Sequence, residues 1–131
     1  MHTLTLATPA RQGMLSMTDR IQALVADQGW QDGILVLFCP HTTAALTVNE
    51  DADPTVTRDI LVHLAAAIPH RGDYRHAEGN SDAHIKTALV GPSLSLIVAG
   101  GRVQLGTWQG IFFCEFDGPR QRTLWAQWVG A

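Results

Sequence analysis

Residues 33–48 read Gly-Ile-Leu-Val-Leu-Phe-Cys-Pro-His-Thr-Thr-Ala-Ala-Leu-Thr-Val, and this stretch decides the fold. It starts with an apolar run between a glycine and a proline, which predicts a short strand over residues 33–40 that is buried on both faces. A second strand is expected over residues 44–48. His41 therefore lies where one strand ends and the next begins, a place where a core histidine is less expected than in the middle of a strand.

Strands are also expected near both ends of the chain. Residues 3–8 alternate between apolar and polar side chains, which is typical of a half-buried strand. Gly100 and Gly101 predict a turn between two later strands. These later strands are expected over residues 93–98, 102–105, 111–116 and 123–129.

The strand expected over residues 111–116 carries an unusual side chain. Alternation places Glu115 on the same face as Ile111 and Phe113, opposite the even-numbered residues. A carboxylate is seldom buried without a partner. Glu115 among aromatic neighbours is therefore a candidate site residue.

Helices are expected between these strands. The first starts at Ser16, with Asp19 three residues further on as in a capping box, and Gly29 ends it. The second has Asp53 as its cap and Pro54 at its first position. The stripes expected to face the core are Met17, Ile21, Leu24 and Val25 in the first helix, and Val56, Ile60, Leu64 and Ile68 in the second.

A polar loop that leads onto a third helix lies at residues 74–91, Tyr-Arg-His-Ala-Glu-Gly-Asn-Ser-Asp-Ala-His-Ile-Lys-Thr-Ala-Leu-Val-Gly. Asn80 or Ser81 is the expected cap, and Gly91 ends the helix. One interpretation is an anion site at the helix N-terminus. The other is a well-capped surface helix with two solvated histidines. The expected apolar stripe is Ile85, Ala88 and Leu89.

The order of these elements indicates an α+β fold with a mainly antiparallel sheet system and about three helices. At 131 residues the chain is expected to form one domain, residues 1–131. Its 46% hydrophobic and 16% charged residues exclude a disordered chain. The nine basic residues are scattered, so no nucleic-acid partner is expected.

A cytoplasmic protein without a membrane partner is expected. No apolar run approaches the ~20 residues that a membrane span needs, and the N-terminus does not have the pattern of a signal peptide. Cys39 and Cys114 both lie in apolar runs. Two buried free thiols are therefore more plausible than a disulfide.

His41, His76 and His84 are the most prominent candidate ligands. Three histidines with an open fourth position suit a catalytic zinc or another divalent ion. Histidine also titrates near neutral pH, as acid–base catalysis requires. No H-E-x-x-H or C-x-x-C motif is present, so both interpretations stay open. The carboxylates nearby are Glu50, Asp51, Glu78 and Asp82.

Phosphate binding is a third interpretation, although no glycine-rich phosphate loop is present. Gln109 either points into the same cavity as Glu115 or belongs to a local bend beside a packed tryptophan. The candidate phosphate ligands are Asn80, Ser81, Arg102, Arg120 and Lys86.

Four runs, in order along the chain, carry a family resemblance. They read His-Thr-Thr-Ala-Ala-Leu-Thr-Val-Asn-Glu-Asp at 41–51, His-Ala-Glu-Gly-Asn-Ser-Asp-Ala-His-Ile-Lys at 76–86, Gly-Arg through Gly-Thr-Trp-Gln at 101–109, and Glu-Phe-Asp-Gly-Pro-Arg at 115–120. Together they resemble the YjbQ family, also called the secondary thiamine-phosphate synthase family.

The resemblance implies a compact α+β domain with a β-sandwich-like core, assembled as a homotrimer. It implies a pocket that holds His41, His76 and His84, where a divalent metal, zinc or magnesium, binds. It also implies a weak thiamine-phosphate synthase activity, which joins a pyrimidine diphosphate to a thiazole phosphate with loss of pyrophosphate. A protein that binds a metal or a small phosphorylated metabolite without catalysis is the alternative.

The resemblance also suggests roles for the candidate residues. A metal would hold the diphosphate leaving group, and the helix start at Asn80 and Ser81 would hold a phosphate. A proton would be moved by His41, His84 or Glu115. The other candidates for substrate or phosphate binding are Arg102, Gln109 and Arg120.

Overall fold

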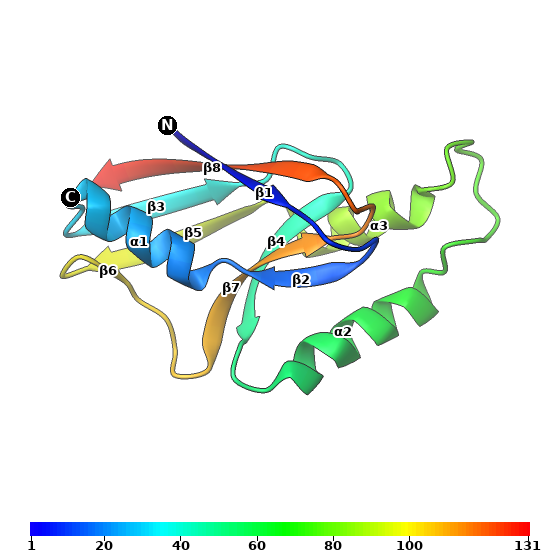
Figure 1. The fold of residues 1–131 in the computed structure, drawn as a ribbon, viewed down its shortest axis with the longest axis horizontal. Coiled ribbons are helices and arrows are strands. Elements are labelled where there is room, and N and C mark those ends of the chain that lie inside the picture. The colour runs from blue at the N-terminus through cyan, green and yellow to red at the C-terminus, as the bar shows by residue number, and fades with distance from the viewer.

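Two antiparallel sheets and three helices make up the structure, a computed structural model that describes residues 1–131 (Figure 1). The larger sheet has the strand order β1-β8-β3-β5-β6, and the smaller has the order β2-β7-β4. The predicted α+β class with antiparallel, sandwich-like sheets is confirmed. The elements are β1 (His2–Ala7), β2 (Gly13–Ser16), α1 (Thr18–Gln28), β3 (Gly33–Phe38), β4 (Ala44–Glu50), α2 (Pro54–Ala67), α3 (Ser81–Val90), β5 (Ser93–Ala99), β6 (Arg102–Val103), β7 (Gln109–Glu115) and β8 (Gln121–Gly130).

The start of α1 differs from the prediction. Residues 13–16 form the short strand β2, in which Ser16 pairs with Phe112 of β7. The helix starts after Met17, without a side-chain cap, because the Ser16 hydroxyl instead donates to Asp51 Oδ2 at 2.7 Å. The rest of α1 is as expected: its apolar stripe faces the core, with Leu24 only partly buried, and Gly29 ends the helix at φ 68°.

The core lies between the two sheets and α1. It is built by inward-facing residues of both sheets together with the stripe of α1, and all of these are almost completely buried. The inner face of the larger sheet contributes alternate residues of each strand, as a half-buried sheet requires. Core residues include Ile21, Val25, Leu35, Leu37, Leu46, Ile111, Phe113 and Leu124.

The strand that is buried on both faces is β7, not β3 as predicted. Along β3 only alternate residues are buried, and Ile34 and Phe38 remain 48% and 40% exposed. β7 lies at the centre of the smaller sheet, with the core on one face and α2 and α3 on the other. The two predicted faces of β7 are confirmed, since Ile111 and Phe113 belong to one apolar cluster and the even-numbered residues to another.

The two helices over the smaller sheet are less apolar at their contact than predicted. Asp53 caps α2 as expected, accepting from the Thr55 N–H at 2.9 Å, but no residue of α2 is fully buried. In α3 the predicted stripe is wrong, because Ile85 and Leu89 are 40% and 68% exposed. The buried face of α3 consists of Asp82, Ala83, Lys86 and Thr87.

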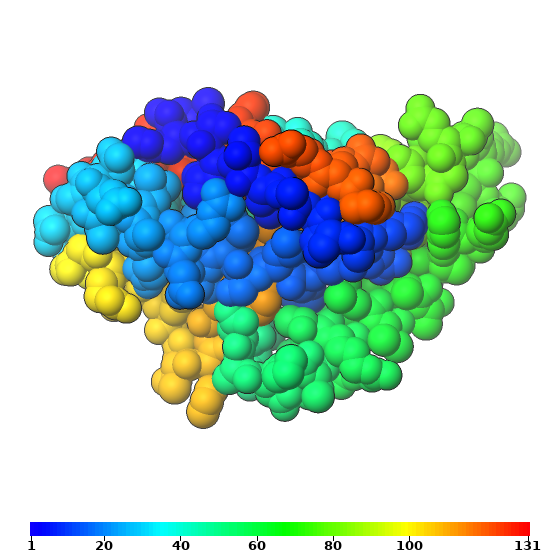
Figure 2. All heavy atoms as spheres, viewed as in Figure 1, coloured from blue at the N-terminus to red at the C-terminus, as the bar shows by residue number.

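The chain between α2 and α3 and the turn between β7 and β8 lie toward the same end of the molecule. The chain between α2 and α3 projects at the end opposite to both termini, and the N-terminus of α3 lies near the turn between β7 and β8. In the space-filling view the light-green surface of this chain lies beside the orange surface of the turn (Figure 2). None of the three helices has the length and apolar character that a membrane span requires.

Candidate functional site

A polar pocket of about 390 Å³ lies where the β3–β4 junction, the β7–β8 turn and the start of α3 meet. Its lining contains histidines, arginines, carboxylates, hydroxyls and an amide, and Pro40 is its one apolar side chain. We call it the polar pocket. Its lining residues are Pro40, His41, Thr42, Thr43, Glu78, Asn80, His84, Asp117, Arg120 and Arg122.

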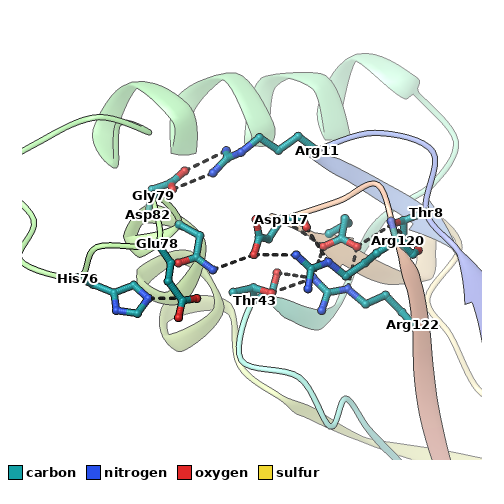
Figure 3. Close-up of polar contacts among 12 residues, drawn as sticks. Thr8, Arg11, Thr43, His76, Glu78, Gly79, Asp82, Asp117, Arg120 and Arg122 are labelled. Carbon is teal, nitrogen blue, oxygen red and sulfur yellow. Dashed lines mark hydrogen bonds and ion pairs between the residues drawn. The ribbon is translucent and has the colours of Figure 1, made fainter.

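A buried ion pair supports the floor of the polar pocket (Figure 3). Glu115 is fully buried, and Arg122 Nε donates to its Oε1 at 2.8 Å while Nη2 donates to Oε2. The Thr8 hydroxyl donates to Glu115 Oε1 at 2.7 Å, and the Asp117 N–H donates to Oε2 at 3.0 Å. Burial alone would raise the pKa of Glu115, but these hydrogen bonds outweigh it and hold the pKa below its usual range.

Arg122 is held in place by two neighbours. Its Nη2 also donates to the Thr43 hydroxyl at 2.9 Å, so the guanidinium plane is fixed on two sides. Nη1 makes no hydrogen bond to the protein. Arg122 is only 3% exposed, and it lines the polar pocket.

A second set of contacts ties the start of α3 to the β7–β8 turn. Asn80 Nδ2 donates to Asp117 Oδ2 at 2.9 Å, and Arg120 Nη2 donates to the same oxygen at 3.1 Å. Asp117 therefore joins two pocket residues that lie forty positions apart in the sequence. The side chain of Arg120 is 49% exposed, so it can turn toward a ligand at small cost.

The buried face of α3 is held by a three-residue network outside the polar pocket. Arg11 donates to both carboxylate oxygens of Asp82, at 2.9 and 3.2 Å, and Lys86 Nζ donates to Asp82 Oδ2 at 3.1 Å. Asp82 and Lys86 are both fully buried. Burial alone would raise the pKa of Asp82, but the hydrogen bonds from Arg11 and Lys86 hold it below its usual range. Lys86 Nζ also lies 5.9 Å from the ring centre of Phe116.

His41 extends the sheet beyond the end of β3. Its Nε2 lies 2.9 Å from Thr123 N and 3.1 Å from Thr123 O, both on β8. The imidazole thus takes the place of a strand neighbour that Pro40 cannot provide. Burial and then the charge of Arg122 lower the pKa of His41 from its ordinary value, so the ring is neutral at pH 7.

The three predicted histidines are not brought together as one ligand set. His41 and His84 line the polar pocket, whereas His76 and His84 line a neighbouring hollow and lie 5.4 Å apart between ring centres. No three His, Cys, Asp or Glu side chains lie close enough to hold a metal ion. The three histidines of one chain therefore do not form the ligand set that the resemblance implied, and zinc or magnesium remains a prediction.

Two predicted substrate residues lie away from the polar pocket. Arg102 is on β6, at the end of the molecule opposite to α3. Gln109 is exposed at the start of β7, and its Oε1 accepts from the Gly106 N–H at 2.8 Å. Of the two interpretations of Gln109, the structure favours the local bend over a cavity shared with Glu115, since the two residues are six positions apart on one extended strand, or ~20 Å. Ser81 lines only the neighbouring hollow.

The sequence did not lead us to Arg122, the cation of the pocket that is held by hydrogen bonds to Glu115 and Thr43. A signal for it was present, because Arg122 shares its face of β8 with Leu124 and Ala126, and all three are buried. A charged residue in phase with core residues requires a buried partner. Glu115 was that partner, and the two residues together were predictable as a pair. Both predicted free thiols, Cys39 and Cys114, are buried, and burial raises their pKa values to about 11 and 12.

Fold and pocket together define a small two-sheet α+β protein with a polar site of arginine and histidine. The chain matches the family described as UPF0047 protein YjbQ-like over residues 2–131, and it belongs to this family. It is 47% identical to the UPF0047 protein MJ1081 of Methanocaldococcus jannaschii over 123 residues, which cover 94% of this chain and 89% of that protein. It is 46% identical to the UPF0047 protein YugU of Bacillus subtilis over 130 residues, 98% of each chain.

Solved structures agree with this assignment. A YjbQ/UPF0047 family protein of Clostridium acetobutylicum, an ortholog of YugU, matches with a TM-score of 0.96 at 48% identity, over 98% of this chain and 100% of that one. A conserved hypothetical protein of Thermus thermophilus matches with a TM-score of 0.92 at 43% identity, over 98% and 100% of the two chains. The resemblance found in the sequence is confirmed.

Proposed function

We propose that the polar pocket binds the diphosphate or phosphate group of a small metabolite, and that the protein is a weak thiamine-phosphate synthase. The observation that carries the proposal is Arg122, which lines the pocket with a guanidinium that Glu115 and Thr43 hold in place and whose Nη1 makes no hydrogen bond to the protein. A preorganised guanidinium is the preferred protein group for phosphate. Arg120 and Asn80 line the same pocket and supply further N–H donors.

The charges around the pocket suggest how an anion would bind. The guanidinium groups of Arg120 and Arg122 are balanced by the carboxylates of Asp117 and Glu78 among the lining residues. Net charge therefore contributes little, and directed N–H groups would carry most of the affinity. Glu78 is 75% exposed and lies 3.7 Å from His76, so it can turn away when an anion enters.

The proposed reaction needs little from the protein beyond binding and one proton. The thiazole nitrogen forms a bond to the methylene carbon of the pyrimidine, and the bond from that carbon to the diphosphate oxygen breaks. The bonding electrons leave with pyrophosphate, which becomes more basic as it departs. His84 lines the pocket, is half-buried, and would donate a proton to the leaving oxygen. His41 is the other histidine in reach.

Glu115 receives a different role from the catalytic one expected. It does not line the pocket, because it is fully enclosed behind Arg122. We therefore assign Glu115 to positioning Arg122 and place the proton transfer on a histidine. Zinc or magnesium remains a prediction, and metal analysis of the purified native protein would decide it.

The proposal extends to a homotrimer. The outer face of the larger sheet exposes Ile34 at 48%, Ile97 at 66% and Val129 at 55%. Ile34 pairs in register with each of the other two, so the three side chains adjoin. Contiguous apolar surface of this kind is typical of an interface. Light scattering at micromolar concentration would test it, and a monomer would contradict it.

The free thiols also support the expected cytoplasmic location.

The activity test combines both substrates with the native protein and measures pyrophosphate and thiamine phosphate together. We expect equal amounts of the two products, and a loss of about tenfold or more in His84→Ala, within the range that one acid–base group contributes. Binding of inorganic pyrophosphate without turnover would instead support the non-enzymatic alternative, a protein that holds a phosphorylated metabolite. Absence of both binding and turnover would contradict both.

A further inference from the structure

We infer that the hollow beside the polar pocket is a second subsite, which takes the flat heteroaromatic ring of a ligand whose phosphate lies in the polar pocket. We call this hollow the ring pocket. It has a volume of about 400 Å³ and is lined by Asp73, Tyr74, Arg75, His76, Ser81, His84 and Ile85. The inference rests on the proposed function, because it takes the anion position from it.

The two pockets are neighbours that share a wall. His84 lines both of them. His76 of the ring pocket lies 3.7 Å from Glu78 of the polar pocket, Nε2 to Oε2, so this exposed pair also stands on the boundary (Figure 3). A ligand that spans both pockets would therefore pass His84, and its atoms between ring and phosphate would lie near that imidazole.

The linings of the two pockets differ in polarity, so that one suits an aromatic ring and the other suits a phosphate. The polar pocket has Pro40 as its one apolar side chain, whereas the ring pocket has the larger carbon surfaces of Tyr74 and Ile85. His76 and His84 stand at 88° to each other, 5.4 Å apart between ring centres. This edge-to-face pair forms a corner that presents one aromatic face and one edge, an arrangement that suits a third flat ring.

The ring pocket is also built rather than open chain. The Tyr74 hydroxyl donates to Pro69 O at 2.6 Å, and Gly79 O lies 2.9 Å from His70 Nε2. Gly79 has φ 77°, a conformation that favours glycine and lets the loop turn into α3. Both contacts lie at the surface and tie the loop back to residues 69 and 70, which reduces the loop freedom that a ligand would have to remove.

The polar atoms of the ring pocket narrow the class of ring. Asp73 supplies carboxylate acceptors, Arg75 supplies guanidinium donors, and the Ser81 hydroxyl can donate or accept. An aromatic ring that carries both an amino group and ring nitrogens with lone pairs, such as an aminopyrimidine, has the complementary pattern. Each pocket alone is near the lower limit of ligand-site volumes, about 300–1,000 Å³, whereas the two together suit a ligand with two chemically different ends.

The test compares two ligands on three variants by calorimetry. The ligands are inorganic pyrophosphate and the pyrimidine diphosphate. Ile85→Gln alters the ring pocket at an exposed helix position, and Leu89→Gln is its matched control one turn further along α3, outside the ring pocket. Arg120→Gln alters only the polar pocket.

We expect Ile85→Gln to weaken the pyrimidine diphosphate by about tenfold while pyrophosphate changes by less than about twofold. Leu89→Gln should leave both affinities unchanged, and Arg120→Gln should weaken both. If Ile85→Gln weakens neither ligand, or both equally, the ring pocket is wrong while the anion site stands. If pyrophosphate does not bind the native protein and Arg120→Gln changes nothing, the proposed function fails, and the ring pocket with it.

Discussion

Helices α1 and α3 follow opposite rules of burial, although both present an apolar stripe in the sequence. In α1 the stripe faces the core, and Ile21 and Val25 are completely buried. In α3 the stripe faces outward, and the fully buried side chains include Asp82 and Lys86. The difference teaches that an apolar stripe decides the facing of a helix only where no ion network competes for the same buried position.

The competing interaction on α3 comes from a different part of the chain. Arg11, in the connection between β1 and β2, binds Asp82 with two hydrogen bonds, and Lys86 completes the network one turn along α3. A buried charge that is left without a partner is costly, so the network tolerates no rotation of the helix. In this orientation of α3, Ile85 and His84 line the ring pocket.

Removal of Asp82, the centre of the ion network on α3, should cause the largest loss of stability. In Asp82→Ala, Lys86 remains buried without an anion, and we expect a loss of about 3–5 kcal/mol in unfolding free energy. Ile21→Ala in α1 is the apolar counterpart, expected to cost about 2–5 kcal/mol through the cavity that it leaves. Denaturation in urea, followed by circular dichroism, measures both. A cost below ~1 kcal/mol for Asp82→Ala would show that the network does not hold α3.

Replacing both buried charges should recover much of that loss. In the double variant Asp82→Leu with Lys86→Met, no buried charge is left unpaired, and Arg11, which is 28% exposed, can turn to solvent. We expect at least about 2 kcal/mol of recovery relative to Asp82→Ala, as in other buried pairs replaced by apolar residues. The same urea titration measures it. A double variant as unstable as the single one would mean that the shape of Asp82 matters more than its charge.

A fall in pH should reduce the stability that the α3 network provides more than the stability that the α1 stripe provides. The effect should be smaller than that of the substitutions above. The pKa values of Asp82 and Glu115 are lowered from ordinary values of 3.8 and 4.5. Their stabilisation is therefore fully present above those values and is lost as pH falls through the lower pKa values of the folded state. We expect Ile21→Ala to lose as much stability as the native protein between pH 7 and pH 3. The Asp82→Leu, Lys86→Met variant should lose less, and an equal loss would contradict the assignment.

The smallest effect is expected on the exposed face of α3. Leu89 is 68% exposed, so Leu89→Gln should change the unfolding free energy by no more than about 0.5 kcal/mol. Leu24→Gln, at the partly buried edge of the α1 stripe, is the matched substitution and should cost more. Thermal unfolding of the two variants under one condition compares them directly. A loss above ~1.5 kcal/mol for Leu89→Gln would indicate that another copy covers this face.

Local signals in the sequence were reliable where the residues act locally. Gly29 ends α1, and Asp53 with Pro54 starts α2, because caps depend only on neighbouring backbone groups. β2 was missed, since its four residues have little alternation and are defined by their partner, β7. The facing of α3 was missed because the deciding residue, Arg11, lies seventy-one positions away.

The candidate site residues also divide into those whose place could be predicted from the sequence and those whose place could not. His41, Asn80, His84 and Arg120 were expected in a pocket and line one together. Their convergence follows from strand ends and helix starts, which gather at one edge of a sandwich. Arg102 and Gln109 belong to equally prominent sequence runs but lie elsewhere, and sequence order alone could not reveal this, since each sits on a strand whose direction is set by the whole sheet. The roles assigned to all six residues remain predictions.

The contact between His41 and Thr123 selects one tautomer of the imidazole. The Thr123 N–H points at Nε2 over 2.9 Å, and Nε2 can accept it only when the ring proton is on Nδ1. A proton on Nε2 could reach Thr123 O at 3.1 Å, but it would also meet the Thr123 N–H, whose acceptor would be lost. Nδ1 makes no hydrogen bond to the protein, so the neutral ring offers a hydrogen-bond donor there. The backbone of one strand thus determines which proton chemistry a histidine of the neighbouring junction can offer.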